Sequence, residues 1–399
     1  MHTTSFSLAP TYLDAINLAP GVNGQFDSNG RRNESDIFVR GFGRWQVPLL
    51  VDGVRIYLPA DNRLDFSRFL TGDVAEIQIQ KGYASVLAGP GAMGGLINLV
   101  SIKPTQAFEG EATEGFVLTD SEAVSGSQGY ARIGSRHDSY YVQGSVSYVD
   151  RNSWNLPGGY IPTATSLQPV GRRTNSDSSD LRFNLKAGFT PNDTDEYTVN
   201  FTRNQGSKGG LLNVYNNPQS PANYFWRWPQ WDSQSVSILT YAQIGEAYLK
   251  TKLFYNTFAN VLKAYDDITY TTQSTNGRFT SPYSDDAFGV SAESGIDFEN
   301  HALKGAFHFR TDGHDEYNDN RPTAAPNLHT IEPVQHQEQD AWSVALEDTY
   351  HVTSAINVVA GISFDDYTIT ASQDYNATLG LYSYPKGGAN AFNAQGAFI

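Results

Sequence analysis

The chain contains no cysteine and only two methionines among its 399 residues. The absence of cysteine fits an envelope compartment in which no disulfide is needed, and chance absence fits nearly as well. No apolar run approaches the roughly 18 residues of a membrane-spanning helix, which excludes a helical membrane protein. The net charge is -15, so the chain would repel the phosphates of a nucleic acid.

Motifs of common enzymes are also missing, since there is no HExxH, Walker loop, GxSxG or paired-cysteine site. The acidic stretch at 314–319 lacks the spacing of an EF-hand loop. The histidines are interpreted as solvated polar residues rather than metal ligands. They are His301, His308, His314, His329 and His336. The sequence therefore predicts no catalytic residue, no cofactor and no metal site.

Glycine and short apolar runs dominate residues 39–104. The runs at 48–51, 75–79 and 96–102 alternate with glycine-rich turns. Asp52-Gly53, flanked by apolar residues, predicts a tight hairpin. Residues 11–20 have helical spacing that ends at Pro20 and Gly21, and residues 66–70 suggest a further helical turn. These features predict a small α+β unit.

From residue 111 onward, apolar and polar residues alternate with period two, most regularly at 140–148, 181–189, 197–202 and 358–365. Stretches of about ten such residues suit tilted strands that cross a bilayer. Short connections are predicted near 136–138, 190–195, 245–246, 300–301 and 352–353. Long connections are predicted near 150–178, 205–231, 261–289, 311–339 and 371–390. Short and long connections alternate strictly, as the periplasmic turns and extracellular loops of outer-membrane barrels do. About twelve strands are expected, with a modest loop at 121–126 after the first.

Residues 39–98 resemble the plug domain of TonB-dependent outer-membrane receptors. The matching motifs are Val39-Arg40-Gly41-Phe42, Val51-Asp52-Gly53-Val54, Lys81-Gly82, Val86-Leu87-Ala88-Gly89-Pro90 and Gly94-Gly95-Leu96-Ile97-Asn98. Each motif is weak alone, but their order is specific. Ala88 departs from the aromatic residue that the family often has there, a difference that we expect a plug to tolerate.

The resemblance implies an all-β transmembrane β-barrel with an amino-terminal α+β plug domain. The expected divisions are a plug at 1–104, a linker at 105–110 and the first part of the barrel at 111–399. Plugged barrels close with about 22 strands, so twelve strands would be an incomplete barrel. No signal peptide is recognisable at residues 1–10, and the TonB-contacting segment of the family is expected to precede this chain.

The resemblance further implies a receptor in the outer membrane of a Gram-negative bacterium, and not an enzyme. Its expected function is siderophore transport for iron uptake, with cobalamin, haem or carbohydrate as alternative cargo. Iron would be present only as part of the transported chelate. The expected partners are TonB, outer-membrane lipid and a small-molecule ligand.

The candidate ligand-binding residues lie at the expected apex of the plug. Arg40 and Tyr57 match family motifs, whereas Arg44, Trp45, Asn62 and Arg63 are placed by loop position alone. Arginine suits an anionic ferric chelate because its donors bind oxygens in a fixed fork. Arg40 could equally be a structural residue paired with a carboxylate.

An aromatic stretch at 223–231 contains Tyr224, Trp226 and Trp228. It is expected to precede a strand beginning at Asp232, and to form either a membrane-interface girdle or an aromatic wall for a planar ligand. Two other protein classes remain open. A secreted β-rich adhesin would explain the alternation but not the plug motifs. A hydrolase using Asp365 and Asp366 would need both carboxylates on one face, and neighbours on a strand face opposite ways.

Overall fold

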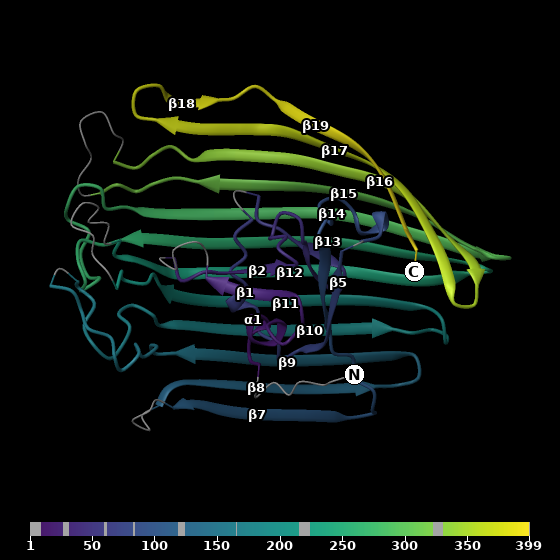
Figure 1. Cartoon of the computed structure of the whole chain (residues 1–399), viewed down its shortest axis with the longest axis horizontal. Coiled ribbons are helices and arrows are strands. Elements are labelled where there is room, and N and C mark those ends of the chain that lie inside the picture. Colours follow the sequence, from purple (N-terminus) through teal and green to yellow (C-terminus); the bar gives the residue numbers. More distant parts are fainter. Residues whose placement is uncertain are drawn as a thin grey trace.

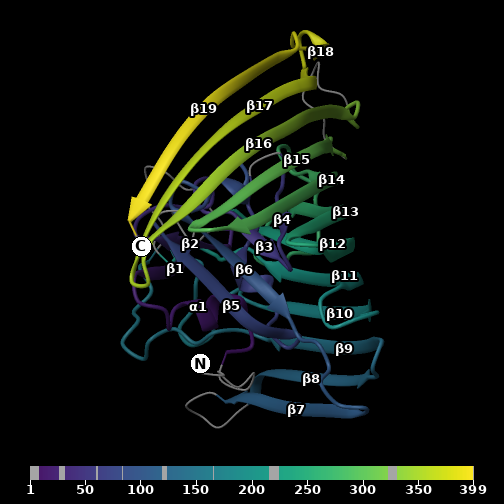
Figure 2. The ribbon, with the colours of Figure 1, turned by 90° about the vertical axis from the view of Figure 1, so that its right-hand side faces the viewer.

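The computed structural model describes residues 9–26, 32–59, 62–82, 84–118, 124–164, 166–214, 224–321 and 330–398. An amino-terminal domain of residues 9–104 contains two small sheets, and the rest of the described chain forms one antiparallel sheet of thirteen strands. The large sheet is strongly curved, and the amino-terminal domain lies against its concave face (Figures 1 and 2).

The amino-terminal domain contains short elements packed around one apolar core. They are α1 (Tyr12–Ile16), β1 (Val22–Phe26), β2 (Ser35–Val39), β3 (Leu49–Val51), β4 (Val54–Ile56), η1 (Phe66–Arg68), β5 (Val74–Lys81), η2 (Val86–Ala88) and β6 (Gly95–Ser101). Strands β1 and β2 pair with each other, and the second sheet has the order β4-β3-β6-β5. Tyr12, Ile37, Leu49 and Ile97 are almost fully buried in the core.

Local sequence signals account for these elements. Thr11 caps α1 reciprocally with Asp14, which satisfies backbone donors at the start of the helix. The predicted hairpin joins β3 to β4, and both turn residues have positive φ, 49° at Asp52 and 77° at Gly53. This backbone geometry is typical of the tight turns that Asp-Gly favours. The helix near residue 12, the hairpin and the helical turn at 66 are therefore confirmed.

Except at its last strand, the large sheet runs in sequence order, with each strand pairing antiparallel to the next. Its strands are β7 (Glu109–Leu118), β8 (Val124–Arg136), β9 (Tyr140–Arg151), β10 (Ser178–Phe189), β11 (Glu196–Gly209), β12 (Trp226–Ile244), β13 (Ala247–Ala264), β14 (Thr280–Phe298), β15 (His301–Glu316), β16 (Gln335–Thr353), β17 (Ile356–Asn376), β18 (Gly380–Ser383) and β19 (Gly387–Phe398). Strand β17 pairs with β18 near its end and with β19 along most of its length.

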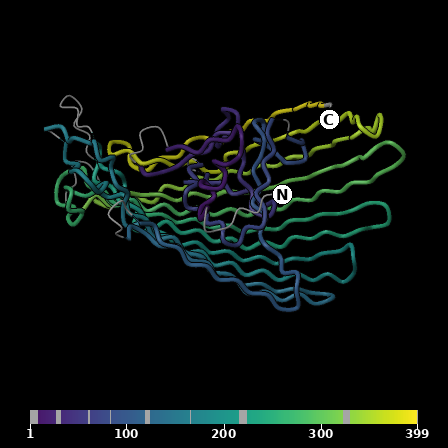
Figure 3. The backbone as a smooth tube through the Cα atoms, turned by 60° about the horizontal axis from the view of Figure 1, so that its bottom comes forward, coloured from purple at the N-terminus to yellow at the C-terminus, as the bar shows by residue number. Residues whose placement is uncertain are grey.

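Short and long connections alternate as expected and lie at opposite ends of the sheet (Figure 3). Several predicted boundaries were wrong. The expected long connection at 371–390 instead contains the end of β17, all of β18 and the start of β19. Strand β7 begins two residues before 111, and β8 already includes 124–126 of the expected loop, whose other residues lie outside the described ranges.

Strands β12 to β17 are 16 to 21 residues long, well beyond the expected ten. In β15 and β16 the extra length lies toward the long connections, where both faces of the strands are polar, as in the 310–316 segment of β15. Period-two alternation disappears where neither face is apolar, so the sequence pattern could not reveal these extensions.

The large sheet is polar on its concave face and apolar on its convex face. In β10, the side chains of Arg182, Asn184 and Lys186 are buried against the amino-terminal domain, whereas Phe183 and Leu185 are 40% and 58% exposed. This distribution is the reverse of that in a water-soluble sheet and matches a lipid-facing surface around a polar interior. Separately, none of the described helices is long and apolar enough to cross a membrane.

Candidate functional site between the amino-terminal domain and the sheet

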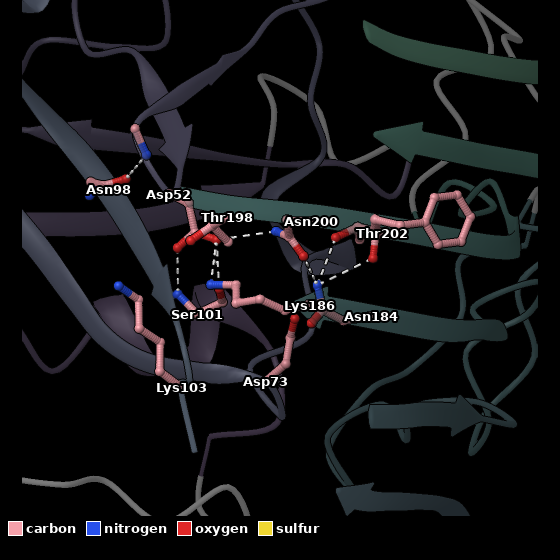
Figure 4. Close-up of polar contacts among 12 residues, drawn as sticks. Asp52, Asp73, Asn98, Ser101, Lys103, Asn184, Lys186, Thr198, Asn200 and Thr202 are labelled. Atoms are coloured by element: carbon pink, nitrogen blue, oxygen red, sulfur yellow. Dashed lines mark hydrogen bonds and ion pairs between the residues drawn. The ribbon is translucent and has the colours of Figure 1, made fainter. Parts of the chain in front are cut away.

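The amino-terminal domain contacts β10 and β11 through buried charged groups (Figure 4). The Lys186 ammonium lies 3.0 Å from the Asp52 carboxylate and also contacts the Ser101 hydroxyl. Ser101 donates its backbone N–H to Asp52 over 2.8 Å. Asn200 on β11 donates to the same carboxylate over 3.1 Å. The hairpin turn is therefore fixed to the sheet by a charge pair with a complete set of hydrogen bonds.

A second pair joins Arg182 on β10 to Asp73, which precedes β5. The guanidinium donates twice to this carboxylate, from Nε and Nη2, and both distances are 2.8 Å. Such two-point contacts fix the orientation as well as the separation of the partners. A further pair has the cation on the amino-terminal domain and the carboxylate on the sheet, since Arg68 lies 2.7 Å from Asp180 on β10.

A third cluster lies nearer the long connections, where Lys208 on β11 reaches Asp65 at 2.6 Å. Burial alone would raise the pKa of Asp65, but the charges of Lys208 and Arg68 outweigh it and hold that pKa below its usual value. The pKa of Asp52 is also lowered. Burial alone would raise it, but the charge of Lys186 and the hydrogen bonds from Ser101 outweigh the effect of burial. The pKa of Glu34 is instead raised, because burial exceeds the attraction of Lys208 at 3.6 Å.

Contacts with β15 involve aromatic and cationic groups instead. The Arg310 guanidinium lies 4.4 Å from the ring centroid of Tyr57, and that of Arg55 lies 5.5 Å from the same ring. Arg310 also donates to Asp312 over 2.7 Å. Burial, and then the charge of Arg310, lower the pKa of Arg55 to about 10. Two guanidinium groups therefore lie near the Tyr57 ring, and such a cluster of cations suits an anionic ligand.

Three of the predicted binding residues lie in one loop region. Asn62 is 3% exposed and donates to the Arg44 backbone carbonyl over 3.1 Å, so its side chain supports the loop. The Arg44 guanidinium lies 3.5 Å from Asp36, and Arg63 is partly buried. Residues 60 and 61 of this loop lie outside the described ranges.

Arg40 and Trp45 occupy different surroundings. The Arg40 backbone has a φ of 51°, its N–H donates to Gly21, and its side chain passes near Gly82. The Trp45 side chain is 50% exposed. Of the six predicted apex residues, Trp45 therefore offers the most open aromatic surface, and Tyr57 has the strongest cationic surroundings.

The predicted aromatic stretch lies mostly inside β12, because this strand begins at Trp226 rather than at Asp232. The β11–β12 register shifts between Lys208 and Asn204, and the β12–β13 register shifts between Arg227 and Gln230. The resulting bulge changes which residues face the interior. Trp228 is 4% exposed and lies under the Lys208 ammonium, 5.0 Å away.

Trp228 therefore belongs to the interior and not to an outward-facing girdle. Trp226 packs against Tyr224, with 4.7 Å between ring centroids. The Arg32 guanidinium lies 5.8 Å from the Trp226 ring. Trp226 also contacts Trp228, with 6.2 Å between ring centroids, so the three aromatic residues form one connected cluster. A ligand-binding role for this cluster stays a prediction.

Sequence reasoning missed the charged partners on the sheet. Arg182 and Lys186 were visible only as polar positions in an alternating strand, and no local signal identifies a partner more than 100 positions away. The interpretation of His314 as solvated was wrong, because it is buried between Asp285 and Glu316. His329 lies outside the described residues. Within the described ranges, no group of three His, Cys, Asp or Glu side chains is placed to hold a metal ion.

Comparisons with known proteins show what this chain resembles. Residues 7–96 match the family model described as TonB-dependent Receptor Plug Domain. A ferric enterobactin receptor of Pseudomonas aeruginosa is 27% identical over 210 residues, covering 47% of this chain and 28% of the relative. The vitamin B12 transporter BtuB of Vibrio vulnificus is 32% identical over 111 residues, covering 28% of this chain and 17% of the relative.

The fold has a solved counterpart in the ferric citrate transporter FecA in its unliganded form. The two structures agree with a TM-score of 0.72 at 14% identity, over 100% of this chain and 58% of that chain. At this identity the likeness concerns the fold alone. The chain spans less than two thirds of the length of each of these three proteins.

Proposed function

The chain carries a TonB-dependent receptor plug domain and has the plug-and-barrel fold of these receptors, and from this premise we propose that it acts in importing a scarce ligand across the outer membrane. The ligand binds from outside to the apex of the plug and the long connections. Energy coupled through TonB then rearranges the plug, and the ligand passes into the periplasm. The convex apolar face contacts outer-membrane lipid in a Gram-negative bacterium.

The cargo we propose is a ferric siderophore. The observation that carries this proposal is the pair of guanidinium groups, Arg55 and Arg310, near the Tyr57 ring, since many ferric chelates are anionic. The ferric enterobactin relative supports the same cargo class. Cobalamin is the second candidate because another relative is a vitamin B12 transporter. Haem and carbohydrate cargo are further alternatives within the class.

No bond is made or broken in this function, so the protein is proposed to be a transporter without a cofactor. Iron enters only within the cargo. Asp365 lies on the buried face of β17 and accepts from Asn393 over 2.7 Å, whereas Asp366 lies on the opposite face. These two carboxylates therefore do not support a hydrolase.

Uptake of labelled ferric siderophores by iron-starved cells tests the proposal. The whole gene would be expressed in hosts with and without TonB. We expect TonB-dependent uptake that Trp45→Ala with Tyr57→Ala reduces about tenfold or more, equivalent to a loss of about 1.4 kcal/mol. Asp193→Ala, at an exposed position in the short connection between β10 and β11, is the control. Normal membrane insertion without uptake of any iron chelate would reject the iron cargo and direct the test to cobalamin.

A further inference from the structure

A cavity of about 380 Å³ separates the plug from the inner face of β13 to β16. The plug side is formed by the hairpin turn at Gly53, by Arg55, and by the η2 segment with the following Gly89-Pro90. The cavity extends toward the short turns, since Lys250 and Lys304 lie near the starts of β13 and β15. It is therefore located below the Tyr57 region, on the side toward the periplasm.

The lining of this cavity is cationic although the chain as a whole is acidic. Five lysine and arginine side chains line it, together with two glutamates. The basic residues are Arg55, Lys250, Lys252, Lys304 and Arg310, and the acidic ones are Glu293 and Glu347. A cleft lined by an excess of one charge concentrates ions of the opposite charge.

The partners of these cations leave much of their charge uncompensated. Lys252 donates to the Gly53 carbonyl over 2.9 Å, and Arg55 donates to the Pro90 carbonyl over 2.6 Å. Both acceptors are neutral. Among the described residues, the buried Nε of Arg55 has no hydrogen-bond partner. Within the described part of the chain, Lys304 has no hydrogen bond or ion pair.

The two glutamates are already engaged. Glu293 lies 3.0 Å from Lys250 and accepts from Tyr248 over 2.8 Å. Glu347, directly across from Lys304 in the β15–β16 register, accepts from Ser85 over 2.7 Å. The positive charge of Lys252, Lys304 and Arg55 is therefore available to a ligand.

The opposite side of the plug differs both in the pairing of its charges and in the space between plug and sheet. There the cations Arg182, Lys186 and Lys208 each have a plug carboxylate as partner, in well-packed buried contacts. Removing one partner of such a pair leaves an uncompensated buried charge, which resists separation of the plug from β10 and β11. The β13–β16 side has neutral contacts and free space, so a ligand can enter there with less disruption.

We propose that this cavity is a binding site for an anionic ligand, through which anionic cargo moves between the plug and β13–β16 toward the periplasm. The role of the site in transport rests on the proposed function, whereas its affinity for anions depends only on the residues that line the cavity. The residues assigned to ligand binding are Arg55, Lys252 and Lys304, whereas Arg310 is already paired with Asp312 at 2.7 Å. The chemical class of ligand is a carboxylate-rich or otherwise polyanionic chelate.

A single introduced thiol can measure the electrostatic potential in the cavity, since the printed chain has no cysteine. Ser291 lines the cavity, directly between Lys252 and His308 in the strand register. The protein from the whole gene, with Ser291→Cys, would be treated in outer membranes with two methanethiosulfonates. One carries an anionic sulfonatoethyl group and the other a cationic trimethylammonium-ethyl group. Protein without the substitution provides the background.

The matched control is Ser235→Cys, which lines a neighbouring cavity together with Asp285, Asp286 and Arg182. The measured quantity is the rate of thiol modification by the anionic reagent divided by the rate with the cationic reagent. We expect this ratio to be at least about tenfold higher at position 291 than at position 235. Lys304→Gln should lower the ratio at 291 at least about threefold, because the interaction of unit charges several ångströms apart is lost. Lys263→Gln, on the opposite face of β13 from Lys252, should leave it unchanged.

Citrate provides the binding test. Trisodium citrate should slow modification of Ser291→Cys by the anionic reagent, and sodium chloride of equal ionic strength should slow it less. Equal ratios at 291 and 235, no reaction at 291 in folded protein, or no specific effect of citrate would each overturn the proposal. The assay needs neither TonB nor uptake. A failed uptake experiment therefore leaves this site standing, and a failed thiol experiment leaves the transport proposal standing.

Discussion

At the scale of single residues, buried charge pairs fix the plug to one side of the sheet. The side chains of Lys186 and Asp52 are 1% and 8% exposed, so each depends on the other for compensation of its charge. The same dependence holds for Lys208 and Asp65, both 1% exposed. Such pairs need not add net stability, but breaking one is costly because a single charge then remains buried.

Lys186→Met should therefore lower the free energy of unfolding by about 3–5 kcal/mol. The measurement is urea unfolding of the purified protein in detergent. Adding Asp52→Asn should restore part of the loss, because the carboxylate left alone is then neutral. Lys103→Met is the control. It breaks the half-exposed pair with Glu196, which should cost at most about 1 kcal/mol. Equal losses in the two lysine variants would contradict the argument.

The lowered pKa values of Asp52 and Asp65 predict a loss of stability in acid. Their contribution to the free energy of unfolding is fully present above pH 3.8, the pKa of an aspartate in the unfolded chain. It is lost as the pH falls through the lower pKa values of the folded state. Glu34 has a raised pKa and therefore has the opposite effect. Its contribution to the stability of the folded protein increases as the pH falls toward 4.5. The decline should thus begin only below about pH 4.

Thermal unfolding midpoints between pH 7 and pH 2.5 would measure this decline. The double variant Asp52→Asn with Asp65→Asn should start from a lower midpoint at neutral pH and fall less steeply in acid. An unchanged slope in the double variant would show that other carboxylates cause the acid loss.

At the scale of elements, strand glycines make room for aromatic rings on neighbouring strands. Gly188 on β10 lies directly across from Tyr141 on β9, and a Cβ at position 188 would lie 2.2 Å from the ring. Gly289 with Phe254, and Gly295 with Tyr248, repeat the arrangement between β13 and β14. Tyr141 is fully buried and donates to Glu196 over 2.5 Å, so the ring connects three strands.

Gly188→Ala should displace the Tyr141 ring and lower the free energy of unfolding by about 1–3 kcal/mol, the usual cost of overpacking. The thermal midpoint of the purified protein measures the effect. Gly305→Ala is the matched control, because a Cβ there would meet its nearest atom at an ordinary 3.7 Å. It should be neutral or slightly stabilising. A larger loss for position 305 than for position 188 would reject the packing explanation.

At the scale of the whole molecule, the burial pattern is that of a sheet with lipid outside and a polar domain inside. Apolar side chains on the convex face remain 40–60% exposed at Phe183, Leu185 and Ile362, among others. A secreted adhesin would expose such a surface to water, where contiguous apolar patches promote aggregation. The convex face therefore favours the membrane protein over the adhesin.

Phe183→Arg, near the middle of β10, should destabilise the inserted protein by about 2–4 kcal/mol if this position lies near the bilayer midplane. The measurement is unfolding by guanidinium chloride from lipid vesicles. Ile161→Arg, in a long connection and 83% exposed, should have little effect. A protein that stays monomeric without detergent would argue for the adhesin instead.

The sequence by itself determined the family resemblance, the hairpin at Asp52-Gly53, the period-two strands and the alternation of short and long connections. These are local properties, because a turn or a strand face depends on neighbouring residues. Strand ends were less predictable, since alternation vanished where β15 and β16 become polar on both faces. The β12 bulge also escaped detection, and with it the inward position of Trp228.

Only the tertiary structure decided which charges meet. Asp73 and Arg182 are separated by 109 positions, and Asp52 and Lys186 by 134, so no local pattern relates them. The same holds for Arg310 beside Tyr57 and for the cationic cavity between the plug and β13–β16. Each depends on how the plug is seated in the curved sheet. That position results from packing and charge compensation over the whole interface and is not encoded in any single segment.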